Sequence, residues 1–211
     1  MIGNKLSVYM VYRDYPPEWL SESLMSLYEQ SIVDDIEIIF LSYGDKELDT
    51  MLCLLDDFFE KDNFRFYHHK CDSFVDAIKF ATSKCNGDYI MRLDADDILL
   101  GYTSLEYMLN KTIETNADLL MNTYMINDQI INPRTDNLMC QAIIKADKLR
   151  AVEYVQGQTF RDGTTILNTF NKNKYMVVYG DDICTFFHRI HNKSLTSNKD
   201  KVKEMDKKLC S

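Results

Sequence analysis

The first half of the chain repeats one pattern, in which an apolar run of strand length is followed by apolar residues at helical spacing. The strand-like runs are Leu6–Tyr12, Ile36–Leu41, Phe64–Tyr67 and Tyr89–Leu93. Pro16 and Pro17 stand where the first helix should begin, and Ser73 can cap the third. Parallel strands need crossover connections of this kind, usually helices. The pattern therefore predicts an α/β fold with a mostly parallel central sheet and helices on both faces.

The periodicity is weaker beyond residue 100. We expect helices over 104–115 and 164–170, strands over 118–126, 175–179 and 183–187, a turn at 180–182, and a loop or hairpin over 129–137. The aromatic residues Trp19, Phe58 and Phe59 lie on helical stripes, so we expect them in the core. Residues 1–195 are expected to form a single domain. Residues 196–211 form a charged, helix-prone tail without a stop signal, which predicts that the polypeptide continues into further domains.

Charge and cysteine content narrow the range of partners. The sequence holds 24 Lys and Arg against 33 Asp and Glu, a formal net charge of -9. Nucleic acid is an unexpected partner for such a chain, because its binding depends on a basic face that neutralises phosphates. The 6 cysteines form no C-x-x-C pair, and no segment has the length and apolar character of a signal peptide or a membrane span. We therefore expect a cytoplasmic protein with reduced thiols.

Side chains suited to binding stand at the predicted carboxyl ends of the first, second and fourth strands, where open parallel sheets bind ligands. They are Tyr12, Arg13, Ser42 and the run Asp94–Asp97. Three carboxylates within this run repel one another unless a cation or hydrogen-bond donors offset the repulsion, and oxygen ligands favour Mg²⁺ or Mn²⁺. A calcium EF-hand would need Gly and Glu where Leu99 and Leu105 stand. A solvated acidic turn that caps the next helix is the plain structural alternative.

The same segments resemble a known family in order and spacing. The resemblance rests on the runs LSVYMVY at 6–12, PEWLSESL at 17–24, IEII at 36–39 and GDYIMRLDADD at 87–97. Together they are similar to a family 2 glycosyltransferase of the GT-A type, which has a Rossmann-like, mostly parallel sheet. The composition and the uncapped end also suggest the amino-terminal domain of a longer viral enzyme of this family.

The resemblance implies roles for individual residues. Asp94 and Asp96 would form the family's DxD motif, with Asp94 contacting the ribose and both holding the metal that bridges the sugar-nucleotide diphosphate. Phe160–Gly163 resembles the segment that supplies the catalytic base, which would be Asp162. Phe187–Ser194 resembles a late Arg-x-His segment, and His191 is a candidate for a further metal or diphosphate contact.

Other contacts with the donor are less defined. Tyr12 is a candidate to stack on the base, and Arg13 and Arg92 are candidates to hold phosphate or base. The family often has Asp-Asp-Gly-Ser where this chain has Ser42-Tyr43-Gly44-Asp45, so base recognition must differ here.

These residues predict a metal-dependent, inverting transfer of a sugar from a nucleoside diphosphate, UDP by resemblance, to a hydroxyl of a glycan or glycoprotein acceptor. The chain has no glycine-rich phosphate cradle, so Mn²⁺ or Mg²⁺ on the aspartates is the simplest way to hold a diphosphate. A sugar-1-phosphate nucleotidyltransferase is an alternative, but the segment after the first strand lacks the glycine-rich loop that it would need. A non-catalytic module that binds a nucleotide sugar also stays open.

Overall fold

The computed structural model describes residues 5–43, 52–135, 139, 142–191, 204, 205 and 207. The strands within these residues are β1 (Leu6–Tyr12), β2 (Glu37–Ser42), β3 (Phe64–His68), β4 (Tyr89–Arg92), β5 (Ile98–Leu99), β6 (Leu119–Ile126), β7 (Gln129–Ile131), β8 (Ile143–Lys145) and β9 (Val177–His188). The helices are α1 (Pro17–Tyr28), α3 (Asp56–Phe59), α4 (Phe74–Lys84), α5 (Ser104–Glu114), α6 (Ala146–Arg150) and α7 (Asp162–Asn173), with short 3₁₀ turns η1 (Val33–Asp35) and η2 (Pro133–Thr135).

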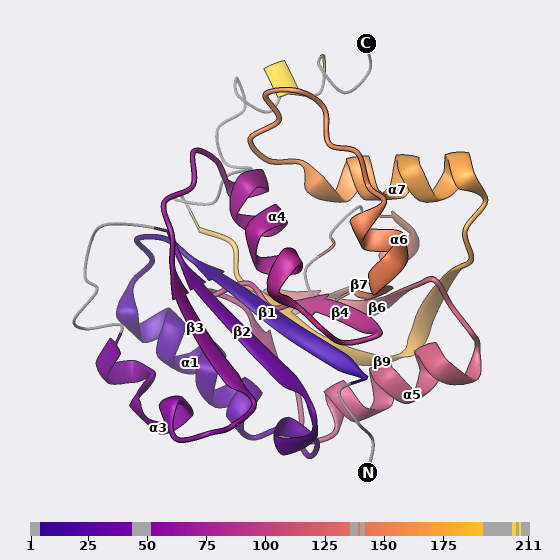
Figure 1. Ribbon diagram of the computed structural model, residues 1–211. Helices are drawn as coiled ribbons and strands as arrows, with labels where there is room; N and C mark the ends of the chain where they lie inside the picture. Colours follow the sequence, from indigo (N-terminus) through magenta and orange to yellow (C-terminus); the bar gives the residue numbers. More distant parts are fainter. Residues whose placement is uncertain are drawn as a thin grey trace.

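The strands in the described part of the chain form a nine-stranded sheet in the order β3-β2-β1-β4-β8-β6-β9-β5, with β7 paired to β6 (Figure 1). The neighbours β3, β2, β1 and β4 are parallel, as the repeat predicts. Their carboxyl ends therefore meet at one edge of the sheet. This confirms the predicted α/β fold, and the parallel part of the sheet is its first half, from β3 to β4.

The central strand β1 is buried on both faces because helices cover both. Its residues Val8, Met10 and Tyr12 pack with α1, α3 and α5, whereas Tyr9 and Val11 pack with α4, α6 and α7. Figure 1 shows α4 and α1 on opposite sides of the strands. This alternation is the two-residue period of a strand placed between two cores. It explains why the strand reads as a continuous apolar run.

Local signals at the helix starts act as expected. Pro17 is the first residue of α1, where its missing N–H costs nothing. Ser73 caps α4, because its hydroxyl accepts a hydrogen bond from the backbone N–H of Asp76 at 3.1 Å. The repeat predicts a helix between the second and third strands. Its first part falls on residues 44–51, which lie outside the described residues, and α3 forms its end.

The second half of the sheet mixes strand directions. Strand β8 is antiparallel to both β4 and β6, whereas β6 and β9 are parallel. Of the predicted loop or hairpin over 129–137, residues 129–131 form β7, which pairs antiparallel with β6, and residues 133–135 form η2, whereas 136 and 137 lie outside the described residues. The predicted short helix at 164–170 is part of the longer α7.

The predicted turn at 180–182 is wrong. Strand β9 runs through these residues, and its pairing with β6 shifts register next to Asn122 and Thr123. Such a bulge absorbs extra residues without reversing the chain. A Cβ atom on Gly180 would clash with Asn122 Oδ1, so this glycine serves a close approach between strands rather than a turn.

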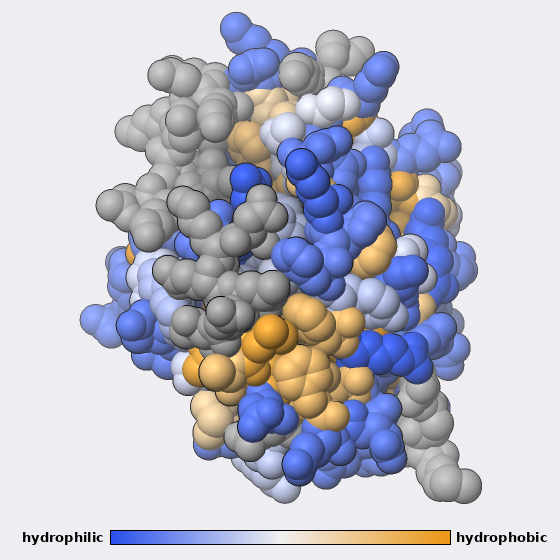
Figure 2. Space-filling model, turned by 60° about the vertical axis from the view of Figure 1, so that its left-hand side comes forward, coloured by the Kyte–Doolittle hydropathy of each residue, from blue (hydrophilic) through white to orange (hydrophobic). Residues whose placement is uncertain are grey.

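Two of the three aromatic residues expected in the core are partly exposed. Phe58 is buried, but Phe59 is 46% exposed and packs edge-on against the Phe64 and Phe66 rings of β3. Figure 2 shows apolar side chains gathered on this face, on the side of α3 and β3. Trp19 is half-buried, and its ring contacts His191 instead of the core. The apolar face of a helix can be wider than the area that the neighbouring elements cover, so residues at the border of that face stay exposed.

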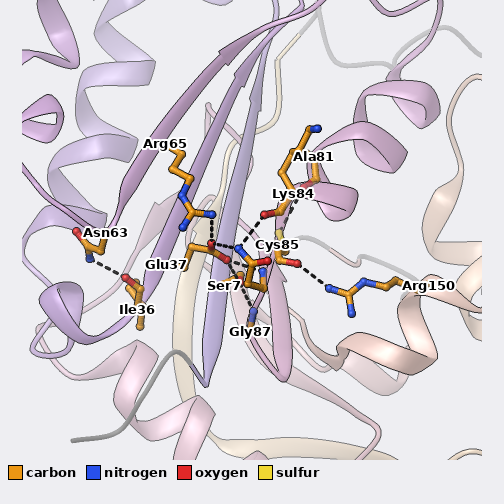
Figure 3. A network of polar contacts seen from close by, with 11 residues as sticks. Ser7, Ile36, Glu37, Asn63, Arg65, Ala81, Lys84, Cys85, Gly87 and Arg150 are labelled. Carbon is orange, nitrogen blue, oxygen red and sulfur yellow. Dashed lines mark hydrogen bonds and ion pairs between the residues drawn. The ribbon is translucent and has the colours of Figure 1, made fainter.

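A buried carboxylate ties the amino ends of the strands together (Figure 3). Glu37, 2% exposed, accepts hydrogen bonds from Ser7 Oγ at 2.5 Å, from Arg65 Nη1 at 2.8 Å, and from the backbone and side-chain nitrogens of Asn86 at 2.7 Å each. Ser7 Oγ also accepts from the Gly87 N–H at 2.8 Å. The network joins β1, β2, β3 and the entry to β4 at the edge opposite the acidic run.

The described cysteines Cys53, Cys71, Cys85 and Cys184 are free thiols. No helix among the described residues is both long and apolar enough to cross a bilayer. Most of the predicted tail at 196–211 lies outside the described residues, and its helical character stays a prediction.

Candidate active site

The acidic run forms a tight turn at the carboxyl edge of the parallel strands. Leu93 N–H donates to Tyr9 O at 3.0 Å and so continues the pairing of β4 with β1 up to the turn. The turn closes through Asp97 N–H on Asp94 O at 3.0 Å, and Ser23 Oγ of α1 donates to the same oxygen at 3.1 Å. Asp96 and Asp97 are 6% and 0% exposed. The run is therefore an anchored, buried turn and not a solvated one.

Asp96 contacts one of the residues predicted to share its role. His191 Nε2 lies 2.7 Å from Asp96 Oδ2. The imidazole is held between aromatic rings, with the Trp19 centroid at 4.5 Å and the Tyr15 centroid at 5.9 Å. Tertiary packing thus brings together two candidates that are far apart in sequence.

Asp97 anchors the end of β9 to the turn. His188 Nδ1 lies 3.0 Å from Asp97 Oδ1, and the same oxygen accepts the Arg189 N–H at 3.1 Å. Arg189 Nε also donates to Asp96 O at 3.1 Å. The sequence predicts Asp97 as part of the acidic run without a contact of its own, and it predicts no role for Arg189. The signal for Arg189 is the segment from Phe187 onward, whose resemblance covers both His188 and Arg189.

The turn carries more negative charge than its neighbours offset. Burial, followed by the charges of Asp97 and Asp94, raises the pKa of Asp96 to about 8. Burial likewise raises the pKa of Asp94 to about 6, although the Arg92 charge opposes the shift. Burial lowers the pKa of His188, but its hydrogen bond to Asp97 and the surrounding carboxylates outweigh this and raise it to about 8. A cation placed here would favour the ionised form of both Asp94 and Asp96.

On the other face of the sheet, Arg92 joins two candidate carboxylates. Its Nε lies 2.8 Å from Asp94 Oδ1, and its Nη1 lies 2.5 Å from Asp162 Oδ2. The guanidinium, 7% exposed, also lies over the Phe74 ring, 5.2 Å from the centroid. Asp162 is the first residue of α7, where the helix dipole favours a negative charge. Arg92 is thus a buried bridge between the turn and α7.

The remaining candidates line the ends of β1 and β2. Ser42 is 2% exposed and pairs in register with Tyr12. Tyr12 is also 2% exposed, packs on Phe40, and donates its hydroxyl to Tyr15 O at 2.8 Å. The expectation that the Tyr12 ring stacks on a base does not fit this burial.

Of the site residues predicted at the ends of β1 and β2, Arg13 is exposed, and its guanidinium lies 5.4 Å from the centroid of the Tyr43 ring. Burial raises the pKa of Tyr43 to about 12, so its phenol stays protonated. Gly44 and Asp45, the other half of the segment that departs from the family pattern, lie outside the described residues.

The donor chemistry of the turn fits a hard or borderline divalent ion. Asp94 and Asp96 offer carboxylate oxygens, and His191 offers an imidazole nitrogen. Within the residues that the structure describes, no three Asp, Glu, His or Cys side chains are grouped as a finished metal centre. An ion here would therefore need oxygens from a substrate or water to complete its shell, as Mg²⁺ and Mn²⁺ commonly do.

A match to a glycosyltransferase family model and a fold shared with solved glycosyltransferases identify this molecule as a glycosyltransferase of the GT-A fold. The chain belongs to glycosyl transferase family 2, whose model matches residues 7–191. No curated protein matches it in sequence.

Solved structures agree on the fold. The S. aureus TarS structure superposes with a TM-score of 0.73 at 13% identity, covering 90% of this chain and 37% of that one. The structure of S. aureus TarS 1-349 in complex with UDP-GlcNAc has a TM-score of 0.73 at 15% identity, and the match covers 92% of this chain and 61% of that one. The mannosyltransferase PcManGT from Pyrobaculum calidifontis, in complex with GDP-Man and Mn²⁺, has a TM-score of 0.72 at 12% identity, and the match covers 91% of this chain and 59% of that one. This chain thus spans less than two thirds of each of these structures.

Proposed function

We propose that this glycosyltransferase is an inverting, metal-dependent enzyme that transfers a sugar from a nucleoside diphosphate, UDP by preference, to a hydroxyl of a glycan or glycoprotein acceptor. The observation that carries the proposal is the meeting of Asp96 and His191 at the carboxyl edge of the parallel strands, 2.7 Å apart. Structures of similar fold were solved with UDP-GlcNAc and with GDP-Man and Mn²⁺.

Asp94, Asp96 and His191 are the residues that would hold the metal. When bound, Mn²⁺ or Mg²⁺ supplies a Lewis acid for the departing diphosphate, an effect worth several kcal/mol. The raised pKa values of Asp94 and Asp96 support a cation at this turn, because the protein alone does not neutralise their charges. A bound ion would compete with His191 for the Asp96 carboxylate, because His191 Nε2 lies 2.7 Å from Asp96 Oδ2.

Asp162 is proposed as the base that takes the proton of the acceptor hydroxyl as that oxygen attacks the anomeric carbon. Arg92 positions it, since the 2.5 Å contact fixes the carboxylate at the start of α7. The same guanidinium also reaches Asp94, so the base and the donor-binding turn share one rigid support. Proton transfer to such a positioned base typically contributes about 10²–10⁴-fold.

The base of the nucleotide is assigned to the edge formed by Arg13 and Tyr43. Both follow strands that end at the site, and Arg13 is exposed over the Tyr43 ring. Tyr12 and Ser42 then act beneath them as packed support, because both are buried.

The test is a thermal-shift and turnover panel of UDP-, GDP- and dTDP-sugars with and without Mn²⁺. The correct donor should raise the melting temperature only with the metal, since ligand binding to the native state adds RT ln(1 + [L]/Kd). Asp96→Asn should lose the metal-dependent shift, while Asp56→Asn, an exposed change on α3, should keep it. Binding of a donor without hydrolysis or transfer would indicate a non-catalytic module, and no shift with any donor would refute the proposal.

A further inference from the structure

A cavity lies along the outer side of α1, away from the contacts that join Asp94 and Asp162. Its volume is about 860 Å³, within the range of ligand sites. It lies between α1, η1, β5 and the turn that precedes α5. Its lining includes Glu22, Met25, Tyr28, Glu29, Lys61 and Tyr102. We refer to it as the α1 groove.

Buried polar side chains fix the floor of the α1 groove. Gln30 donates through Nε2 to Ser26 O at 3.0 Å and to Gly101 O at 2.9 Å, and its Oε1 accepts the Leu105 N–H at 3.0 Å. Ser26 Oγ accepts the Leu99 N–H at 3.1 Å. These bonds hold α1 against β5 and α5. The groove is therefore preformed, so a ligand would not have to order it.

The rim combines aromatic rings with carboxylates. Tyr28 and Tyr102 are 40% and 68% exposed, and Met25 is 51% exposed. The backbone of Tyr102 is pinned, because its carbonyl accepts the Ser31 N–H at 2.8 Å. Aromatic rings offer a surface to the C–H faces of a sugar ring, and carboxylates accept hydrogen bonds from its hydroxyls. A sugar chain presents both kinds of group along its length.

Charge in the α1 groove disfavours an anionic ligand. Glu22, Glu29 and Asp34 line it against the single ammonium of Lys61 among its lining residues. Lys61 is already engaged, at 2.5 Å from Asp34 Oδ1 and over the Tyr28 ring at 4.9 Å. A nucleotide or phosphate would meet net negative charge, whereas a neutral glycan would not. The groove is thus chemically unlike a site for the sugar nucleotide.

One end of the α1 groove reaches the acidic turn. Glu22 forms an ion pair with Arg189, and Arg189 Nε donates to Asp96 O. Ser23, next to Glu22 on α1, donates to Asp94 O. Arg189 and Ser23 therefore connect the end of the groove to the turn.

We propose that the α1 groove binds a neutral oligosaccharide, as a remote subsite for the acceptor chain. The assignment of that glycan as an acceptor rests on the proposed function. Remote contacts of this kind hold a long substrate while its end reacts, and their binding energy supports orientation at the reacting centre.

The first test measures glycan binding without any donor, by saturation-transfer NMR with a panel of neutral tetrasaccharides built from glucose, mannose, galactose or N-acetylglucosamine. Wild type should bind at least one of them. Tyr102→Ala should weaken that binding about tenfold, because it removes the exposed ring, whereas Tyr102→Phe should bind within about twofold. Met176→Ala, a change at a half-exposed apolar residue outside the groove, is the control.

The second test separates the groove from the donor site. Tyr102→Ala should leave the Mn²⁺-dependent thermal shift with the donor unchanged and should raise the KM of a tetrasaccharide acceptor more than that of a monosaccharide acceptor. No binding of any panel member, equal binding by Tyr102→Ala and wild type, or selective binding of a basic peptide instead would each overturn the inference. If the wild type binds a glycan but no sugar nucleotide, the proposed function fails while the groove assignment stands.

Discussion

Arg92 Nη1 lies 2.5 Å from Asp162 Oδ2, and both side chains are more than nine-tenths buried. The pair connects the end of a central strand to the first residue of α7, and Asp94 shares the same guanidinium. Removing charge from water is costly unless the partner is well placed, so each member depends on the other.

Replacing the proposed base should remove activity but keep the fold. Asp162→Asn retains the size of the side chain and a carbonyl oxygen that can accept a hydrogen bond from Arg92. The amide cannot take the proton of the substrate hydroxyl at neutral pH. Sugar transfer is expected to fall by about 10²–10⁴-fold with an unchanged circular dichroism spectrum. Asp147→Asn, an exposed carboxylate on α6, is the control. Turnover within a few-fold of wild type would rule out Asp162 as the base.

Removing the arginine should affect stability strongly. Arg92→Met leaves Asp94 and Asp162 buried without their common cation, and breaking a buried pair costs about 3–5 kcal/mol. The free energy of unfolding should therefore fall by that amount in urea titrations. Arg92→Met combined with Asp162→Asn should be less destabilised than the sum of the two single variants. Strict additivity would show that the two side chains do not interact energetically.

Metal affinity should rise with pH. The pKa of Asp96 is raised to about 8, so at pH 6 most molecules carry a proton that the ion must displace. Calorimetric titration with Mn²⁺ should give tighter binding and less proton release at pH 8 than at pH 6. A wild-type affinity for Mn²⁺ that does not change between pH 6 and pH 8 would contradict the assignment of the turn.

The metal-free protein should show the opposite trend in stability. Asp96 and His188 both have folded-state pKa values of about 8, above their values in the unfolded chain. The folded state therefore binds more protons, and the stability is present at low pH and lost as the pH rises through about 8. The melting temperature should be lower at pH 9 than at pH 6.5, and Mn²⁺ should reduce the difference. A higher melting temperature at pH 9 without metal would contradict this sign.

The Glu37 network should matter for stability alone. Glu37→Ala removes a buried carboxylate and leaves the donors of Ser7 and Asn86 without it, so unfolding should become easier by about 3–5 kcal/mol. The network (Figure 3) lies at the amino ends of the strands, whereas the acidic turn follows the carboxyl end of β4. The KM for the donor should then stay within about twofold under conditions where the variant is folded, whereas Glu60→Ala, at an exposed position, should change neither quantity. A large increase in KM with unchanged stability would refute this division of roles.

The sequence alone determined the first half of the fold and the position of the acidic turn. The signals there are local: the apolar runs of β1 and β2, the helical stripes between strands, and Asp94–Asp97 at a strand end. Parallel strands force crossovers, so local periods were enough to predict which edge would carry the turn.

Tertiary structure alone decided which distant side chains meet. No local period places His191 on Asp96, Arg92 between Asp94 and Asp162, or Trp19 against an imidazole rather than in the core, because these contacts depend on how β9 and α7 return to the sheet. Gly180 is typical of a turn by sequence, and only its contact with Asn122 on β6 shows that it lies within a strand. The α1 groove likewise depends on tertiary structure, because its walls come from separate elements. Packing between elements is a property of the whole chain, whereas strand and helix periods are properties of short segments.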